Sequence, residues 1–388
     1  MLHPKLREDF PLLSKYIYLD SACMSLKPKQ VIAAITEYYE NYPACAGRSQ
    51  HKLGELVEQK TDETRACAAK FWHARPEEIV FTKNATESIN LVARSLGLKK
   101  DDVVLTTDKE HNSNLLPWLQ TGCRHDIVPS KNGQFDMDAF LKKVKTAKVV
   151  AVCQTTNLDG TSVPLKEIIK EAHKVGALVL SDAAQSAPHQ AIDVKKLDVD
   201  FMAVSGHKML GPTGVGFLYG KKELLEKLNP FMTGGGTALD STYTSVHYDK
   251  IPFRFEAGLQ NYAGITGMKA AFDYLNRIGM DTIMRHEQRL NERLSNTLSS
   301  EKISLLGPKN PALRAGIFSF NINGMDNHTV ALLLNEHNIL VRSGAHCVHS
   351  WFNANKLQGS VRASLYVYNT DEDIDTFAET LKKIVKLA

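Results

Sequence analysis

The sequence of 388 residues has no long apolar run and little excess of charge of one sign. No apolar stretch approaches the roughly 20 residues that a membrane-spanning helix needs. Its 47 basic and 43 acidic residues give a formal net charge of +4, and no basic run with interleaved aromatic residues occurs. The sequence therefore predicts a protein whose partners are neither nucleic acids nor membranes.

Cysteines are few and scattered, and no CxxC pair occurs among them. The six are Cys23, Cys45, Cys67, Cys123, Cys153 and Cys347. This spacing fits free thiols in a reducing compartment better than a disulfide framework or a zinc site, so we expect no metal. The first nine residues are charged rather than apolar, which argues against a signal peptide. We therefore expect a cytoplasmic protein.

The first two thirds of the chain alternate between β-rich runs and helical patterns. An apolar content of 43% is enough for a large core and predicts two domains. The β-rich runs are residues 79–82, 103–107, 148–153, 177–181, 201–205 and 214–219, and helical patterns occupy residues 87–96, 137–145 and 165–175. This alternation predicts an α/β fold with a mainly parallel sheet covered on both faces.

The pattern changes after about residue 255. A long helical stretch at residues 265–299, interrupted near Gly279, precedes shorter strand and helix patterns at 316–321, 328–336, 339–342, 360–367 and 371–387. These patterns predict a smaller α+β domain. The predicted domains are residues 16–255, and residues 256–388 together with 1–15.

A lysine and an aspartate each follow an apolar run. Lys208 comes shortly after residues 201–204, and Asp182 comes shortly after residues 177–180. Pyridoxal phosphate needs a lysine for a Schiff base and a carboxylate beside its pyridinium nitrogen. A lysine in a loop is usually a surface residue, but the pairing with Asp182 favours a cofactor site.

Three further polar residues come just after predicted strands, namely Thr86, His111 and Asn157. Open α/β sheets bind their ligands beyond the carboxyl ends of the strands. We therefore expect one cleft to collect these residues with Asp182 and Lys208.

Residues 81–90, which include Ala85 and Thr86, have the pattern of a strand, a polar turn and a helix start. The free N–H groups and positive end of a helix can bind phosphate, although a helix cap without a ligand explains the run equally well. Ser205 and His207 are close enough to Lys208 to reach the same phosphate. The glycine-rich turn after Lys208 is not a dinucleotide-binding motif, because it lacks the glycine spacing of that motif and leads into a strand rather than a helix.

Two more side chains of the predicted cleft could contact the cofactor ring. His111 could stack on the pyridine face, although a structural histidine is the default interpretation. Gln185, one helical turn after Asp182, can hydrogen-bond the phenolic oxygen, and Asn157 occupies a similar position after its strand.

Cys347 lies in a polar stretch near Arg342, His346 and His349. A single cysteine is usually a small buried hydrophobe, but nearby positive charge favours the nucleophilic thiolate. Arg362 could bind an amino-acid carboxylate with two hydrogen bonds, and a surface ion pair is the common alternative for it.

In this order, the motifs resemble those of the cysteine desulfurases, class V enzymes of the fold-type I pyridoxal-phosphate group, and in particular their type II branch. They extend over nearly the whole chain, at residues 18–22, 48–51, 86, 111–114, 157, 182–185, 205–208, 234–236, 254–258, 342–347 and 362–370. The segment between Gly236 and Arg254 has the length of the β-hairpin insertion of that branch. The resemblance implies a homodimer in which a large domain with a seven-stranded, mainly parallel sheet joins a smaller C-terminal α+β domain.

The resemblance also implies a reaction. Lys208 would form the Schiff base with pyridoxal 5′-phosphate and move the proton at the substrate α-carbon, while His111 stacks on the ring and passes protons. Cys347 would receive sulfur as a persulfide while L-cysteine becomes L-alanine, and a sulfur-acceptor or scaffold protein would use it for iron–sulfur cluster or related biosynthesis. Cofactor contacts would come from Ala85, Thr86, His111, Asn157, Asp182, Gln185, Ser205 and His207, and substrate contacts from Ala22, Asn157, Arg342 and Arg362.

Some positions depart from the motifs of that family. Leu259 replaces a threonine that reaches the phosphate of the neighbouring subunit, and leucine cannot donate a hydrogen bond. Residues 21–24 read Ser-Ala-Cys-Met instead of Asn-Ala-Ala-Thr, which could reshape the substrate end of the pocket. Ala345 replaces a common histidine.

Two other function classes stay open. A selenocysteine lyase, an epimerase or another class V lyase would keep the cofactor, but the His346-Cys347 pair favours sulfur transfer. A non-catalytic scaffold of the same fold would not need Lys208, Asp182 and Cys347 together.

Overall fold

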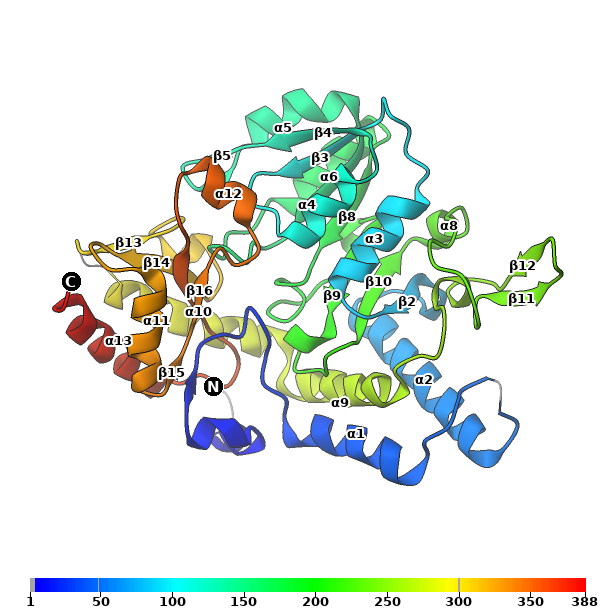
Figure 1. Cartoon of the computed structure of the whole chain (residues 1–388), viewed down its shortest axis with the longest axis horizontal. Coiled ribbons are helices and arrows are strands. Elements are labelled where there is room, and N and C mark those ends of the chain that lie inside the picture. The colour runs from blue at the N-terminus through cyan, green and yellow to red at the C-terminus, as the bar shows by residue number, and fades with distance from the viewer. Residues whose placement is uncertain (1–3, 48, 299–300) are drawn as a thin grey trace.

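The computed structural model describes residues 4–47, 49–298 and 301–388. Arg48, part of one of the motifs above, and Ser299, the predicted end of the long helical stretch, lie outside this part. The described chain forms a large α/β unit and a smaller α+β unit at its side (Figure 1). No helix in the described residues is both long enough and apolar enough to cross a membrane.

A seven-stranded sheet is the centre of the large unit. Its order is β2 (Ile79–Thr82), β10 (Gly216–Gly220), β9 (Phe201–Ser205), β8 (Leu178–Asp182), β7 (Ala147–Cys153), β3 (Val103–Thr107) and β4 (Arg124–Val128). Strand β10 is antiparallel to both neighbours, and the other neighbouring pairs are parallel. The predicted mainly parallel sheet is therefore confirmed.

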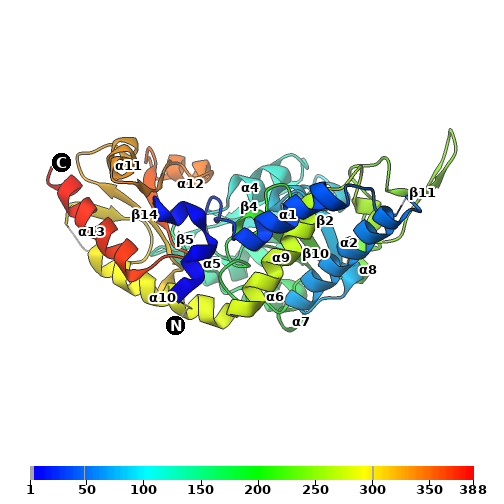
Figure 2. The same ribbon diagram turned by 90° about the horizontal axis from the view of Figure 1, so that it is seen from below.

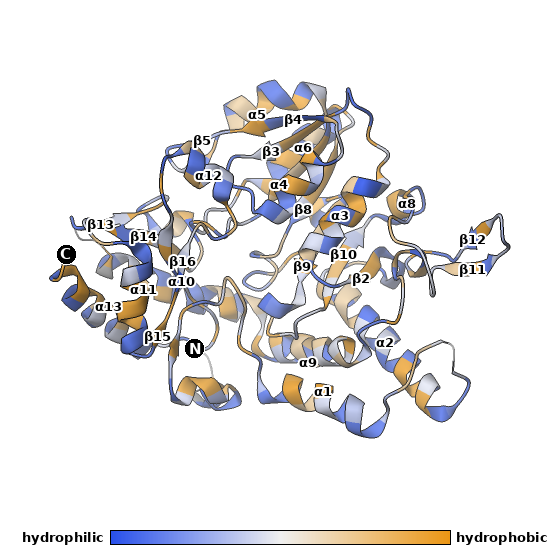
Figure 3. Ribbon diagram, viewed as in Figure 1, coloured by the Kyte–Doolittle hydropathy of each residue, from blue (hydrophilic) through white to orange (hydrophobic). Residues whose placement is uncertain are grey.

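Helices cover both faces of this sheet, which explains why its inner strands read as continuous apolar runs. Every residue of β2, β3, β9 and β10 is buried. Successive residues of one strand, such as Phe217 and Leu218, belong to different core clusters. One face packs on α1 (Lys29–Asn41), α2 (Lys52–Phe71), α6 (Leu165–Lys174) and α9 (Tyr262–Ile278), and the other on α3 (Ala85–Ser95) and α4 (Asn112–Leu119). Apolar colour is correspondingly concentrated in the strands and the inner sides of the helices (Figure 3).

The smaller unit has a four-stranded antiparallel sheet with its own core. The strand order is β13 (Ile303–Leu305), β14 (Ile317–Ile322), β17 (Ser360–Ser364) and β16 (Arg342–Gly344). Its core side chains pack with those of α10 (Met280–Thr297), α11 (Asn327–Glu336) and α13 (Asp371–Val385), and α12 (His349–Ala354) follows β16. This is the predicted α+β arrangement.

The N-terminal segment connects the two units. Strand β1 (Ile17–Tyr18) pairs in parallel with β15 (Ile339–Leu340) of the smaller unit, whereas Phe10 packs in the core of the large one. Helix α9 follows residue 255 in sequence but lies beside α1 and α2 in the core of the large sheet (Figure 2). The division between residues 255 and 256 stays a prediction.

A hairpin of β11 (Ala238–Ser241) and β12 (Val246–Tyr248) projects from the large unit (Figure 1). It lies between Gly236 and Arg254, where the length of the sequence indicates a hairpin insertion, and every residue of β11 is exposed. The remaining short elements are β5 (Ser130–Lys131), β6 (Gln134–Phe135), α5 (Met137–Lys143), α7 (Val194–Leu197) and α8 (Lys222–Leu225).

Candidate active site

A cavity of about 190 Å³ lies at the carboxyl ends of the central strands and extends to the smaller unit. This volume is below the roughly 300–1,000 Å³ of pockets for drug-sized ligands, so it suits a small molecule. All the site residues predicted from the sequence line it, namely Ala22, Ala85, Thr86, His111, Asn157, Asp182, Gln185, Ser205, His207, Lys208, Arg342, Cys347 and Arg362. Their individual roles stay predictions.

The sequence reasoning missed several residues that also line this cavity, namely Cys23, Asn84, Ser113, Cys153, Thr155 and Ala184. Most of them are direct neighbours of predicted ones, or lie at the same strand ends. The rule that ligands bind beyond the carboxyl ends of strands therefore also indicates these positions.

One end of the cavity is formed by the start of α3. The backbone N–H of Ala85 donates to Ser205 Oγ at 3.0 Å, and Thr86 Oγ1 is hydrogen-bonded to Ser113 Oγ at 2.6 Å. The positive end of an 11-residue helix and three hydroxyls thus meet here. This combination is suited to an anion such as a phosphate group.

A close approach between strand β10 and the start of α3 shapes this end. A Cβ atom on Gly216 would lie 2.5 Å from Asn84 Cα and 2.6 Å from Val204 O. Only glycine fits at such distances from backbone atoms, and Asn84 itself caps α3 by accepting a hydrogen bond from Glu87 N at 3.1 Å.

Lys208 and Asp182 lie deeper in the cavity. Lys208 ends a short 3₁₀ turn after β9. Burial lowers the pKa of its amine to about 8, although the negative charge of Asp182 acts in the opposite direction. Asp182 is the last residue of β8, and burial raises the pKa of its carboxyl, while Ala184 N donates to it at 3.0 Å. A substantial fraction of the amine is therefore neutral and nucleophilic near neutral pH.

The N-terminal segment holds the turn that carries Lys208. The carbonyl oxygen of His207 accepts hydrogen bonds from Ser25 N at 3.0 Å and from Lys27 Nζ at 3.2 Å. Burial lowers the pKa of His207 to about 4, and the charges of Lys208 and Lys27 lower it further. His207 is therefore neutral near neutral pH.

His111 caps α4 at another wall of the cavity. Its Nδ1 accepts from Ser113 N at 3.1 Å and is also hydrogen-bonded to Ser113 Oγ at 2.9 Å. Burial lowers the pKa of His111 to about 3, and the charges of Lys208 and Arg362 act in the same direction. A neutral imidazole in this place can lie against an aromatic ring.

Glu110 anchors the segment that carries His111. Its carboxylate accepts from Cys153 N at 2.9 Å, from Asn114 Nδ2 at 2.7 Å and from Thr107 Oγ1 at 2.7 Å. These contacts tie together β3, β7 and α4. Burial raises the pKa of Glu110 to about 7.

Gln185 differs from the prediction in its local structure. Residues 184–189 form successive turns rather than a helix, because the chain must turn sharply away from the end of β8. Its Nε2 donates to Ala22 O at 2.7 Å, and its buried Oε1 has no hydrogen-bond partner.

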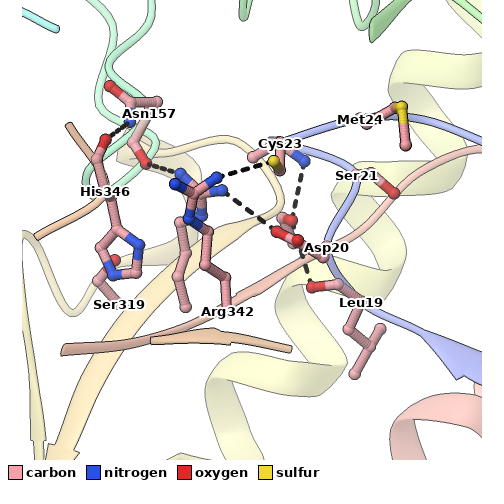
Figure 4. A network of polar contacts seen from close by, with 12 residues as sticks. Leu19, Asp20, Ser21, Cys23, Met24, Asn157, Ser319, Arg342 and His346 are labelled. Carbon is pink, nitrogen blue, oxygen red and sulfur yellow. Dashed lines mark hydrogen bonds and ion pairs between the residues drawn. The ribbon is translucent and has the colours of Figure 1, made fainter. Parts of the chain in front are cut away.

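Arg362 lies on β17 with only 1% of its surface exposed. Its guanidinium donates to Asn157 O at 3.1 Å and to Asp20 Oδ1 at 3.3 Å, and its Nε has no partner. Asn157 Nδ2 in turn donates to His346 O at 2.7 Å (Figure 4). This network joins the N-terminal segment, the large unit and the smaller unit.

Arg342 lies on β16, next to Arg362 on the paired strand. It donates from one terminal nitrogen to Cys23 Sγ at 2.7 Å (Figure 4). The guanidinium that the sequence predicts at the substrate is thus held by a thiol.

Cys347 lies in a loop whose backbone is held from both units. His346 and Cys347 have φ values of +49° and +60°, in the left-handed region that non-glycine residues rarely adopt. Asn112 N donates to Cys347 O at 2.8 Å, and His346 Nε2 is hydrogen-bonded to Ser360 Oγ at 2.9 Å. The loop brings a partly exposed thiol to the wall of the cavity.

These features fit pyridoxal phosphate. The start of α3 suits its phosphate, buried Asp182 suits a pyridinium nitrogen, and Lys208 supplies an amine for a Schiff base. The unpaired Oε1 of Gln185 marks a polar position that a ligand would complete. No group of three or more His, Cys, Asp or Glu side chains among the described residues is arranged to hold a metal ion.

The chain is similar over nearly its whole length to known proteins. The family model for class V aminotransferases matches residues 17–377. A probable cysteine desulfurase from Pyrococcus abyssi is 42% identical over 388 residues, which are 98% of this chain and 97% of that protein. The apo structure of a cysteine desulfurase from Thermococcus onnurineus superposes with a TM-score of 0.97 at 40% identity and covers 100% of this chain and 99% of that one. A cysteine desulfurase from Escherichia coli has a TM-score of 0.91 at 29% identity, covering 100% and 99% of the two chains.

Proposed function

The chain belongs to the class V aminotransferase family, and within it to the cysteine desulfurases, and we propose that Lys208 and Cys347 together convert L-cysteine into L-alanine and leave the sulfur on Cys347. The observation that supports this assignment is the single cavity in which Lys208 and Asp182 of the large unit meet Cys347 and Arg362 of the smaller one. Bound pyridoxal phosphate withdraws electrons from the substrate α-carbon and so makes its proton acidic.

Lys208 moves the proton at the α-carbon. A general base works best when its pKa is near the operating pH, and burial lowers the pKa of this amine to about 8. His111 also lines the cavity, and its imidazole, kept neutral by burial, passes a proton.

Arg362 binds the substrate carboxylate in this proposal. Its guanidinium is buried and shares a weak contact of 3.3 Å with Asp20, so a substrate carboxylate can replace Asp20 as its charged partner. Asn157, the backbone at Ala22 and Arg342 complete the binding site.

Cys347 attacks the sulfur of the substrate as a thiolate. A sulfur–sulfur bond forms on Cys347 while the carbon–sulfur bond of the substrate breaks. The carbon that loses sulfur gains a proton, and the products are alanine and a persulfide on Cys347. The atoms of cysteine are thereby divided between these two products without an outside oxidant or reductant.

We further propose that the protein acts as a homodimer in the cytoplasm. Leu259 is 74% exposed and Leu239 of the hairpin is 66% exposed, and apolar side chains of this kind are suited to a subunit interface. The six free cysteines are suited to a reducing compartment. An acceptor protein would take the persulfide sulfur for iron–sulfur cluster or related biosynthesis.

The proposed domains are residues 16–255 for cofactor binding, and residues 256–388 with 1–15 for the catalytic cysteine. The separate core of the four-stranded sheet supports the second of these domains.

Comparison of the wild type with Cys347→Ala tests the proposed function. Both proteins are incubated with L-cysteine and a reductant, and alanine and sulfide are measured. We expect alanine from the wild type only, while the variant keeps the yellow colour of the bound cofactor. Undiminished alanine formation by the yellow variant would contradict a persulfide on Cys347.

A further inference from the structure

Cys23 is a second partly exposed thiol in the cavity that holds Cys347, and the proposed reaction does not use it. The two cysteines reach the cavity from different parts of the chain, one from the N-terminal segment and one from the loop after β16. The motif that this segment resembles has alanine at the position of Cys23. A nucleophilic group has therefore been added to the site.

The backbone around Cys23 is held in place by the smaller unit. Ala22 N donates to Ser364 Oγ at 2.9 Å, Cys23 N donates to Asp20 O at 3.1 Å, and Asp20 forms a β-bridge with Ser364. The backbone at Cys23 is consequently fixed relative to β17, which pairs with β16, the strand before the Cys347 loop.

Positive charge surrounds the sulfur of Cys23. The Arg342 guanidinium donates to Sγ at 2.7 Å, and Lys208, Arg362 and Lys27 are all close enough to interact electrostatically with Cys23. The carboxylate that faces this group, Asp20, is already paired with Arg362. A persulfide anion formed on Cys23 would accept a charge-assisted hydrogen bond from Arg342.

Cys153, the third cysteine of the cavity, provides a contrast. It is 6% exposed, and burial raises its pKa well above the usual value, with the nearby charge of Glu110 acting in the same direction. Cys153 is therefore held as an unreactive thiol, and it does not share the role of Cys23.

We propose that Cys23 accepts the sulfur atom from the persulfide of Cys347. This step rests on the proposed function, which supplies that persulfide. The Cys23 thiolate attacks the outer sulfur, a bond forms between the two sulfur atoms, and the bond from the outer sulfur to Cys347 Sγ breaks. The electron pair leaves on Cys347 as a thiolate. Cys23 Sγ is oxidised as Cys347 Sγ is reduced, so the step needs no outside oxidant or reductant.

This transfer regenerates Cys347 before any acceptor arrives. The chain can then process a second molecule of cysteine and hold two sulfur atoms, one on each thiol. Arg342 stabilises the negative charge of the persulfide on Cys23.

The amount of alanine formed without reductant or acceptor tests the transfer. The holoenzyme is mixed with excess L-cysteine, and the rapid first phase of alanine formation is measured per chain. In this phase we expect two molecules of alanine per chain from the wild type, and one per chain from each of the variants Cys23→Ser and Cys23→Ala. Cys45→Ala, which removes a partly exposed cysteine outside the cavity, should still give two. Mass spectrometry of the wild type should find one added sulfur on the Cys23 peptide, and the visible absorption of the cofactor should show that each variant is folded.

Two results would overturn the transfer while leaving the proposed function intact. One is an equal first phase in the wild type and in Cys23→Ser. The other is a disulfide between Cys23 and Cys347 with release of sulfide, in place of a persulfide on Cys23. By contrast, no alanine from the wild type, or undiminished alanine from Cys347→Ala, contradicts the proposed function and the transfer with it.

Discussion

The amine of Lys208 is reactive because it is buried, which distinguishes it from the many surface lysines of the chain. We expect Lys208→Ala to lose alanine formation by at least about a hundredfold, the contribution typical of a positioned acid or base, and to change the visible absorption of the cofactor. Lys83→Ala is the matched control, because Lys83 is exposed and precedes the start of α3. Equal losses in the two variants would contradict the role of Lys208.

Glu110 should make stability depend on pH. Burial raises its pKa from 4.5 to about 7, so its contribution to stability is fully present below the unfolded pKa of 4.5. That contribution is lost as pH rises through 7, by at most about 3 kcal/mol. Glu110→Gln cannot ionise. The midpoint of thermal unfolding should therefore fall less between about pH 5 and about pH 8 in this variant than in the wild type.

Single residues were predictable where a chemical requirement coincided with a strand end, as for Lys208 and Asp182. Cys23 was not recognised as reactive, because the guanidinium that contacts it comes from Arg342, more than 300 positions later in the chain. The contacts of Gln185 were equally out of reach, since its amide bonds to Ala22 across the fold.

At the scale of elements, the packing of β10 against the start of α3 determines the anion-binding end of the cavity. We expect Gly216→Ala to displace α3, since the added Cβ meets backbone atoms at 2.5 and 2.6 Å. Overpacking of this kind costs about 1–3 kcal/mol, and cofactor affinity should fall by at least about tenfold.

Gly220→Ala at the other end of β10 is the control for this prediction. Its Cβ would meet side-chain atoms of Leu225 and Phe201, which can shift. This variant should lose some stability and retain cofactor affinity, as measured by titration with pyridoxal phosphate. An unchanged dissociation constant for Gly216→Ala would show that α3 does not position the phosphate.

Elements were predictable when their burial produced a local pattern, as in β3 and β9, where every residue is buried. Strand β4 was missed because four of its five residues are at least partly exposed and it begins with Arg124 and His125. Helix α2 was missed because small and polar residues, including Gly54, Thr64 and Arg65, face its buried side, which removes the apolar stripe.

At the scale of the whole molecule, Leu259 bears on the proposed dimer. If a neighbouring subunit places residue 259 at the phosphate, Leu259→Thr supplies a hydroxyl that leucine lacks. We expect this variant to release pyridoxal phosphate several-fold more slowly, with Leu259→Ala as the control that removes the side chain without adding a donor. Equal release rates in the two variants would argue against a cross-subunit contact. For the proposed dimer, sedimentation of the wild type should give twice the chain mass of 43.1 kDa.

The class of fold was predictable from alternating strands and helices, but the path of the chain between the two units was not. The pairing of β1 with β15 involves two residues on each side, too few to leave a periodic pattern. Helix α9 has the apolar composition of a core helix, and its sequence does not show which of the two cores it joins.

The order of the strands in the large sheet has a consequence for synthesis on the ribosome. Among the residues that the structure describes, the edge strand β2 pairs only with β10, so Thr82 has no strand partner until Gly216 has left the exit tunnel. The start of α3 and Ser205 likewise meet only then. Parallel neighbours and long-range pairing make such assembly slow. A nascent chain shorter than this length consequently has no site for the cofactor, and binding of pyridoxal phosphate reports that the sheet is complete.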